Sequence, residues 1–151
     1  MQITLSADAI ATVKATVPAL RQHGLAITTA MYARLFEDPE IKALFGGAEM
    51  GGQARQPRAL AAAVLAYAEN IDNLPALAGA VEMVAARHVE RRVEPRHYDA
   101  VADALLGAIC DVLGEAATPA VLSAWGDAYW RLAFILRERE AELRAARLQA
   151  A

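Results

Sequence analysis

The chain has 151 residues, of which 56% are hydrophobic and 22% charged, and its formal net charge is −3 at pH 7. This length suits one domain that buries about two-thirds of its unfolded surface. The negative net charge argues against nucleic-acid binding, which needs a concentrated basic face. No apolar run approaches the roughly 20 residues that span a bilayer, so we expect no membrane insertion. Cys110 is the only cysteine; with an N-terminus unlike a signal peptide, it predicts a cytoplasmic protein without internal disulfides.

Abundant alanine, capping residues and prolines divide the chain into helical segments. Ser6 is placed to cap the first segment, and Gly24 interrupts the pattern after it. We expect helices from Ala7 to Leu20, around Ile27 to Phe36, from Pro39 to Leu44, from Pro57 to about Asp72, from Pro75 through His88, from Pro95 to Leu113, and from Pro119 to about Leu148. No convincing two-residue alternation is found, so the predicted fold class is all-α.

Most motifs that carry chemistry are missing from the sequence. The glycine-rich stretch at 46–52 lacks the ending of a phosphate-binding loop and is interpreted as a connection. His23, His88 and His97 are too scattered for a dedicated zinc site. Cys110 lies on an apolar helix face, where an inert buried thiol is expected.

His88 is the most informative single residue. Apolar residues recur at Val81, Val84 and Ala85, and His88 follows one turn after Val84, at the inner edge of the predicted helix. A neutral imidazole in this position can ligate a metal. The alternative is a core histidine satisfied by a backbone carbonyl, and both interpretations fit this segment alone. All-helical chains of this size can enclose a flat cofactor, so haem iron held by one histidine is one option among several.

Seven short motifs carry a specific resemblance. They are ATVP at 15–18, TAMY at 29–32, PEIKALF at 39–45, QPRAL at 56–60, NIDNLP at 70–75, HY at 97–98 and AWGDAY at 124–129. On these motifs, from about Leu5 to Glu142, the chain resembles the bacterial haemoglobins of the flavohaemoglobin family, most closely the single-domain members. The resemblance implies a globin fold, with residues 1–151 forming one globin domain and no reductase domain. Arg144 replaces a tyrosine common in the family, a change expected to leave the haem site intact.

On one side of the haem, the resemblance makes His88 the proximal ligand of a b-type haem iron. It implies that Tyr98 and Glu140 form hydrogen bonds around the imidazole, where a carboxylate would strengthen the histidine as a donor to iron. The alternative for Glu140 is a solvated charge in a Glu/Arg-rich helix. Val84 and Arg87 are expected to contact the haem from the same helix as His88.

On the opposite, ligand-binding side, the resemblance selects Tyr32, Gln56 and Leu60. The Tyr32 phenol would donate a hydrogen bond to bound dioxygen, and Leu60 would cover the ligand. Ordinary core packing is the alternative for both. Pro57 disfavours helical geometry at Gln56, which places Gln56 at or before the helix start. When no ligand is bound, we expect the Gln56 side chain to point away from the iron as readily as toward it. Phe45 is expected to pack on the macrocycle.

The leading functional hypothesis is reversible dioxygen binding, linked to conversion of dioxygen and nitric oxide to nitrate by Tyr32, Gln56, Tyr98 and Glu140 around the haem. Such turnover would need a separate flavin reductase as electron donor. Two alternatives stay open: a non-catalytic oxygen carrier or store, and a haem-based gas sensor or haem-free helical module. A homodimer is a further expectation, taken from related proteins.

Overall fold

A computed structural model describes residues 4–44 and 55–150 of the chain, without the side chains of residues 55 and 56. These ranges contain α-helices and short 3-10 turns but no β-strand, so the all-α prediction is confirmed. The elements are α1 (Ala7–Ala15), α2 (Val17–Leu35), α3 (Pro39–Leu44), α4 (Arg55–Glu69), η2 (Leu74–Leu77), α5 (Ala78–Glu90), α6 (Pro95–Leu113), η3 (Gly114–Ala116) and α7 (Pro119–Ala150). Within the described ranges, no helix combines the length and apolar character that a membrane span requires.

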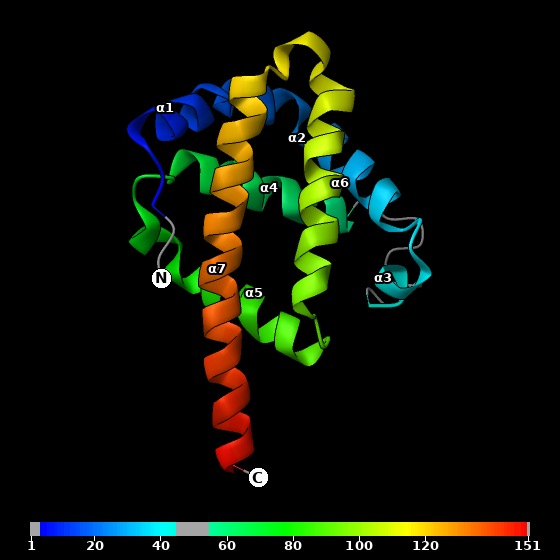
Figure 1. Cartoon of the computed structure of the whole chain (residues 1–151), viewed down its shortest axis with the longest axis vertical. Coiled ribbons are helices and arrows are strands. Elements are labelled where there is room, and N and C mark those ends of the chain that lie inside the picture. The colour runs from blue at the N-terminus through cyan, green and yellow to red at the C-terminus, as the bar shows by residue number, and fades with distance from the viewer. Residues whose placement is uncertain (1–3, 45–54, 151) are drawn as a thin grey trace.

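The long helices α6 and α7 run antiparallel beside each other, and α2 and α4 cross them (Figure 1). Helix α2 packs mainly on α4 and α6, whereas α7 packs mainly on α1 and α5. Helix α5 has its main contacts with α7 and η2, and its Met83 is 57% exposed. The placement of α5 therefore depends largely on α7.

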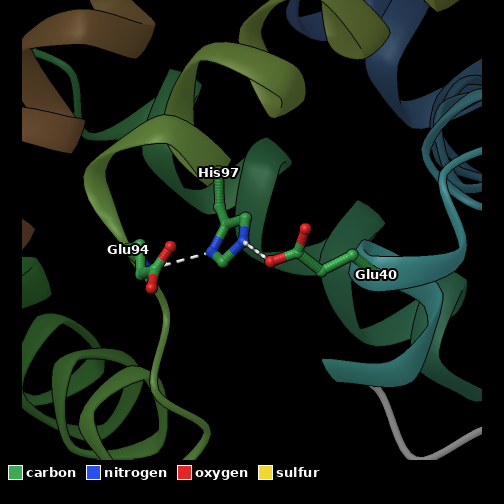
Figure 2. Close-up of side chains that lie close together, drawn as sticks. All are labelled: Glu40, Glu94 and His97. Carbon is green, nitrogen blue, oxygen red and sulfur yellow. Dashed lines mark hydrogen bonds and ion pairs between the residues drawn. The ribbon is translucent and has the colours of Figure 1, made fainter.

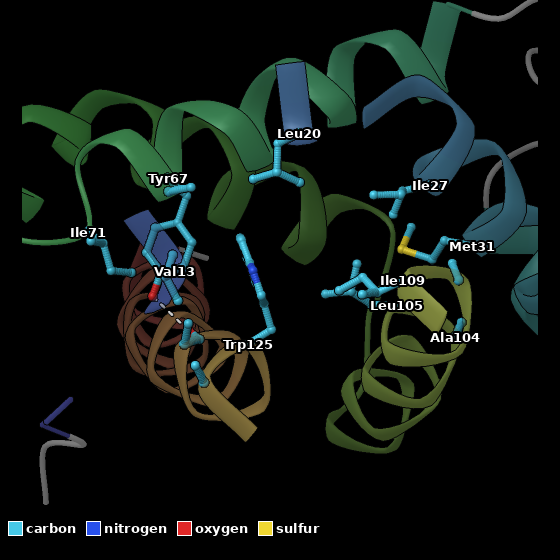
Figure 3. Close-up of a cluster of buried hydrophobic side chains, with 14 of the residues drawn as sticks. Val13, Leu20, Ile27, Met31, Tyr67, Ile71, Ala104, Leu105, Ile109 and Trp125 are labelled. Carbon is cyan, nitrogen blue, oxygen red and sulfur yellow. Dashed lines mark hydrogen bonds between the residues drawn. The ribbon is translucent and has the colours of Figure 1, made fainter. Parts of the chain in front are cut away.

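The main hydrophobic core lies where α2, α4, α6 and α7 meet (Figure 3). Among its members are Val13, Leu20, Ile27, Met31, Tyr67, Ile71, Leu105, Ile109 and Trp125. Two buried hydroxyl groups join the helices around this core. The Trp125 Nε1–H donates to Thr16 Oγ1 (3.1 Å), and Thr28 Oγ1 donates to the carbonyl of Pro57 (2.8 Å). These bonds satisfy polar groups that would otherwise destabilise an apolar interior.

The first helical break lies at Thr16 and not at Gly24, so this part of the prediction was wrong. Pro18 has no N–H and therefore sits in the first turn of a new helix, α2. Thr16 turns the chain by donating its hydroxyl to the carbonyl of Val13 (2.6 Å). Gly24 is buried within α2, and a Cβ atom there would lie 3.6 Å from that of Ala61. That separation is ordinary van der Waals contact, so the packing of α2 on α4 does not require a glycine at this position.

Other helix ends also differ from the prediction. Helix α4 begins at Arg55, so its first turn includes Gln56 and Pro57, a position that tolerates proline. The expectation that Gln56 lies at or before the helix start is therefore wrong by one residue. Pro75 opens the 3-10 turn η2 and not α5 itself.

Helix α5 ends in a Schellman motif built around an arginine. The N–H of Val93 donates to the carbonyl of His88 (3.0 Å), and the N–H of Arg92 donates to that of Val89 (3.2 Å). Arg92 adopts the left-handed conformation, with φ of 59°. Glycine is the usual residue at this position because a Cβ atom is disfavoured there. The motif therefore carries local backbone strain directly after His88.

Replacing Arg92 with glycine is expected to raise the free energy of unfolding by about 0.5–1 kcal/mol, since the left-handed strain outweighs the added freedom of the unfolded chain. Urea unfolding of the purified proteins measures the change. The control is Glu90→Gly, which lies in the regular last turn of α5 and should lower stability by about 1 kcal/mol. Equal destabilisation by both glycines would show that Arg92 is unstrained.

Candidate functional site

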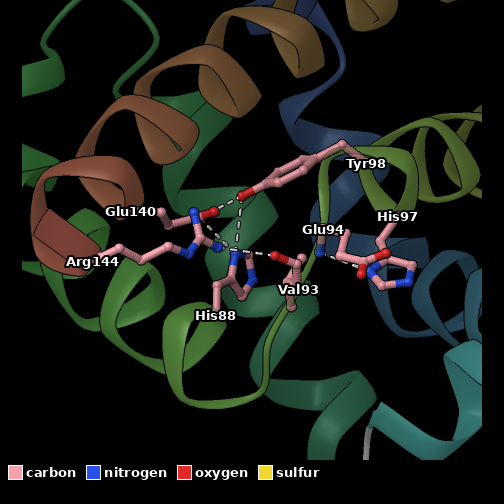
Figure 4. A network of polar contacts seen from close by, with 7 residues as sticks. All are labelled: His88, Val93, Glu94, His97, Tyr98, Glu140 and Arg144. Carbon is pink, nitrogen blue, oxygen red and sulfur yellow. Dashed lines mark hydrogen bonds and ion pairs between the residues drawn. The ribbon is translucent and has the colours of Figure 1, made fainter. Parts of the chain in front are cut away.

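Three helices bring His88, Tyr98 and Glu140 into direct contact (Figure 4). His88 Nδ1 on α5 lies 2.9 Å from Glu140 Oε2 on α7 and 3.0 Å from the Tyr98 hydroxyl on α6. The Tyr98 hydroxyl donates to the same Glu140 oxygen (2.5 Å). The structure thus brings together three residues that are 10 to 52 positions apart in the chain.

The protonation of this triad follows from its hydrogen bonds. Burial and the bond to Glu140 raise the pKa of Tyr98. The phenol therefore stays neutral, and its O–H donates a hydrogen bond to the carboxylate. Since Tyr98 and Glu140 can then only accept at the other contact, Nδ1 of His88 carries the ring proton. In the neutral imidazole, the opposite nitrogen, Nε2, then has a lone pair.

Burial differs sharply within the triad. The side chain of Glu140 is 2% exposed and that of His88 is 28% exposed. The interpretation of Glu140 as a solvated charge is therefore wrong. A buried carboxylate needs partners, and here a phenol and an imidazole N–H provide them. Glu140 and Tyr98 thus hold the His88 ring at Nδ1, while part of the side chain stays exposed.

A second, smaller hydrophobic cluster supports the triad. Ala85 of α5, Tyr98 of α6 and Leu136 of α7 are buried in it, and Val84 packs against it half-buried. The Tyr129 hydroxyl donates to the backbone carbonyl of Tyr98 (2.6 Å). This packing limits the movement of the Tyr98 ring, which the triad needs in one orientation.

The residues selected for the ligand-binding side are placed less completely. Tyr32 is buried on α2, with its ring centroid 5.5 Å from that of Phe36. Burial raises its pKa to about 12, while the charge of Arg91 opposes the rise. Arg91 follows His88 by three residues, so Tyr32 is within electrostatic reach of the end of α5. Leu60 is half-buried on α4 against the main core.

Phe45 and the side chain of Gln56 lie outside the described residues. Arg87 is exposed on α5. Cys110 is exposed as well, so the expectation of a buried thiol was wrong. It lies at the outer edge of the apolar face of α6, whose inner side holds Ile109.

Glu40, Glu94 and His97 form a separate cluster whose atoms are close enough to suggest a metal ion (Figure 2). Its hydrogen bonds argue against a cation. The N–H of Glu94 donates to His97 Nδ1 (2.8 Å), so the ring proton is on Nε2, which faces Glu40 Oε1 at 3.9 Å. The Arg96 guanidinium already pairs with both carboxylates. We interpret the cluster as a reciprocal cap of α6.

The donor set at His88 fits a haem iron. A neutral imidazole with an anchored Nδ1–H and a free Nε2 is the usual proximal ligand in haem proteins, and a carboxylate or carbonyl commonly accepts the other ring proton. The partly exposed ring lies at the edge of an otherwise buried polar network. The fold and the site together define an all-helical protein in which the His88 imidazole is held at Nδ1 by a buried polar pair and is partly exposed.

Comparison with known proteins agrees with this class. The family model Globin matches residues 29–136. A flavohemoprotein of Xylella fastidiosa (strain 9a5c) is 52% identical over 144 residues, which are 95% of this chain and 36% of that protein. The chain belongs to the globin family, and it spans about a third of the length of this curated relative.

Solved structures give the same result. An engineered carbene transferase from Rhodothermus marinus, provisionally described as a nitric oxide dioxygenase, matches with a TM-score of 0.87 and 41% identity, covering 95% of this chain and 98% of that one. The flavohemoglobin of Malassezia yamatoensis, solved with bound FAD and heme, matches with a TM-score of 0.84 and 31% identity, covering 93% of this chain and 38% of that one. The family and this neighbour indicate a haem cofactor.

Proposed function

We propose that this globin holds one b-type haem through His88 and converts nitric oxide and dioxygen to nitrate. The observation that carries the proposal is the contact of His88 Nδ1 with Glu140 and Tyr98, which leaves Nε2 for the iron. Two similar proteins, a flavohemoprotein and one provisionally described as a nitric oxide dioxygenase, support the choice of reaction. We further propose that the chain forms a single globin domain and works in the cytoplasm.

On the proximal side, the protein acts by keeping the Nδ1 proton of His88 in a hydrogen bond to Glu140. When bound, the haem iron supplies reversible dioxygen binding and a one-electron redox change. Glu140 accepts the Nδ1–H of His88, which increases electron donation by Nε2. Tyr98 keeps that carboxylate in place through its own hydrogen bond (2.5 Å). We assign Val84 and Arg87 to haem contacts from α5.

On the ligand-binding side, the protein supplies a hydrogen-bond donor and excludes water. With a pKa of about 12, the Tyr32 phenol remains neutral at physiological pH and can donate to a bound gas molecule. Leu60 covers the ligand with apolar surface. We assign a second donor role to Gln56 and packing on the macrocycle to Phe45.

The overall reaction requires an electron from outside the described residues. One nitric oxide, one dioxygen and one electron together give one nitrate ion. A separate flavin-containing reductase is the electron donor in this proposal. The FAD-containing neighbour provides the chemical precedent for such a donor.

Stopped-flow mixing of the reduced, dioxygen-loaded protein with nitric oxide tests the reaction. We expect one nitrate for each haem and complete oxidation of the iron within the mixing experiment. The same protein loaded with carbon monoxide serves as the control and should form no nitrate. Reversible dioxygen binding without nitrate formation would show an oxygen carrier and refute the enzymatic part of the proposal.

A further inference from the structure

Two arginines of α7 hold α5 at separate points, on either side of Glu140 in the chain. Arg139 forms a bidentate pair with Glu82 in the first half of α5, with N–O distances of 2.6 and 2.9 Å. Arg144 donates to the carbonyl of Val93, just beyond the end of α5 (3.0 Å). In the chain, the carboxylate that contacts His88 thus lies between these two arginines, and Figure 4 shows it near the contact of Arg144 with Val93.

The Arg144 contact acts on the turn that follows His88. The N–H of Val93 donates to the carbonyl of His88 (3.0 Å), so this residue joins the backbone of His88 to the guanidinium of Arg144. The strained Arg92 lies between His88 and Val93 in the chain. A strained turn opens more readily than a relaxed one, and an added bond from α7 counteracts that opening.

Among the described residues, helix α5 is held mainly by one neighbouring helix. Its main packing is on α7 and η2, and its outward side is exposed. Glu140 is fixed by burial in α7, whereas His88 moves with α5. A rotation of α5 about its axis would therefore change the distances from Nδ1 to Glu140 and Tyr98, which are now 2.9 and 3.0 Å.

We propose that Arg144, together with Arg139, positions the proximal imidazole by fixing the rotation of α5 against Glu140. Arg144 is a positioning residue, since it touches the turn and not the imidazole. This inference rests on the proposed role of His88 as the haem ligand. It differs from the expectation that arginine at this position leaves the haem site unaffected, and the test below decides between the two.

The test compares Arg144→Gln, Arg144→Lys and Arg139→Gln with Arg147→Gln, which removes an exposed arginine from the same helix. The first readout, which does not depend on the signal of the haem, is the hydrogen-exchange rate of the Val93 amide in the purified protein. The second is the iron–histidine stretching band in the Raman spectrum of the reduced protein. Glu140→Gln gives the size of the band shift that loss of the carboxylate contact produces.

We expect Arg144→Gln to accelerate Val93 exchange about fivefold, as loss of one partly solvated hydrogen bond implies. It should also shift the iron–histidine band in the direction seen for Glu140→Gln, or broaden that band. Arg139→Gln should shift the band without a comparable change at Val93. Arg144→Lys, which still donates to a carbonyl, should restore both readouts, and Arg147→Gln should change neither.

Two results would overturn the inference. Unchanged Val93 exchange in Arg144→Gln would show that the contact does not hold the turn. Faster exchange with an unaltered iron–histidine band would show that the turn does not orient His88. A wild-type protein that lacks the iron–histidine band altogether would instead refute the proposed role of His88. The exchange rates would still decide whether Arg144 holds the turn that follows α5.

Discussion

Replacing His88 with glycine is expected to lower haem affinity by more than about a hundredfold, beyond the loss that removal of a single outer partner of a metal ligand causes. The substitution removes the ring nitrogen that Glu140 and Tyr98 contact. Free imidazole should enter the space left by the side chain and restore the cofactor, because the carboxylate and phenol that bind its N–H remain. Haem transfer to an acceptor apoprotein, with and without imidazole, measures both effects.

The matched control is His23→Gln. His23 lies on α2, half-buried and far from the triad in the chain, and its replacement should leave haem transfer unchanged. Equal haem retention in His88→Gly and the wild type would contradict the assignment of His88. Failure of imidazole to restore binding would show that the Glu140–Tyr98 pair does not hold a free ring.

The second large effect is expected for Tyr32→Phe, which should accelerate dioxygen dissociation about tenfold to a hundredfold. This range corresponds to loss of one hydrogen bond to a strongly polarised acceptor. Burial raises the pKa of Tyr32 to about 12, so the phenol carries its proton across the range in which the protein is stable. The wild-type dissociation rate should therefore be independent of pH between about 6 and 10, because the pKa of the donor lies above that window.

Tyr67→Phe is the matched control, since it removes another buried hydroxyl. That hydroxyl donates to the carbonyl of Ala128 (2.7 Å) within the main core. Stopped-flow displacement of dioxygen by carbon monoxide measures the rate for each protein. Similar dissociation from Tyr32→Phe and the wild type would show that Tyr32 does not contact the ligand.

The sequence predicted the fold class and most helices because capping residues and helical periodicity act locally. It failed where the packing of one helix on another decides the outcome. Glycine often signals a break, but Gly24 lies buried inside α2, which packs on α4 and continues through this position. Cys110 failed for a related reason, since an apolar neighbour does not fix which side of a helix faces inward. Such choices depend on the other helix and are absent from the local pattern.

The candidate site was predicted through family resemblance and not through residue patterns. His88 alone was open to two interpretations, and Glu140 looked like one of several solvated charges. The structure places both with Tyr98, across three helices. The role of Arg144 gave no sequence signal beyond a departure from the family, because its partner is a backbone carbonyl. Backbone partners have no residue type by which a sequence could reveal them.

The buried Glu140 carboxylate provides an acceptor for His88, but a buried charge is costly for the stability of the fold. Buried ionic groups can often be exchanged for well-packed apolar side chains with a gain in stability of about 1–4 kcal/mol. Joint replacement of Glu140 and Tyr98 by leucine and phenylalanine would give such a purely apolar contact between α6 and α7. The resulting chain would lose a buried charge, but the Nδ1–H of His88 would lose both of its acceptors. Selection for thermal robustness alone would therefore tend to erase the contact that we propose to tune the bound metal.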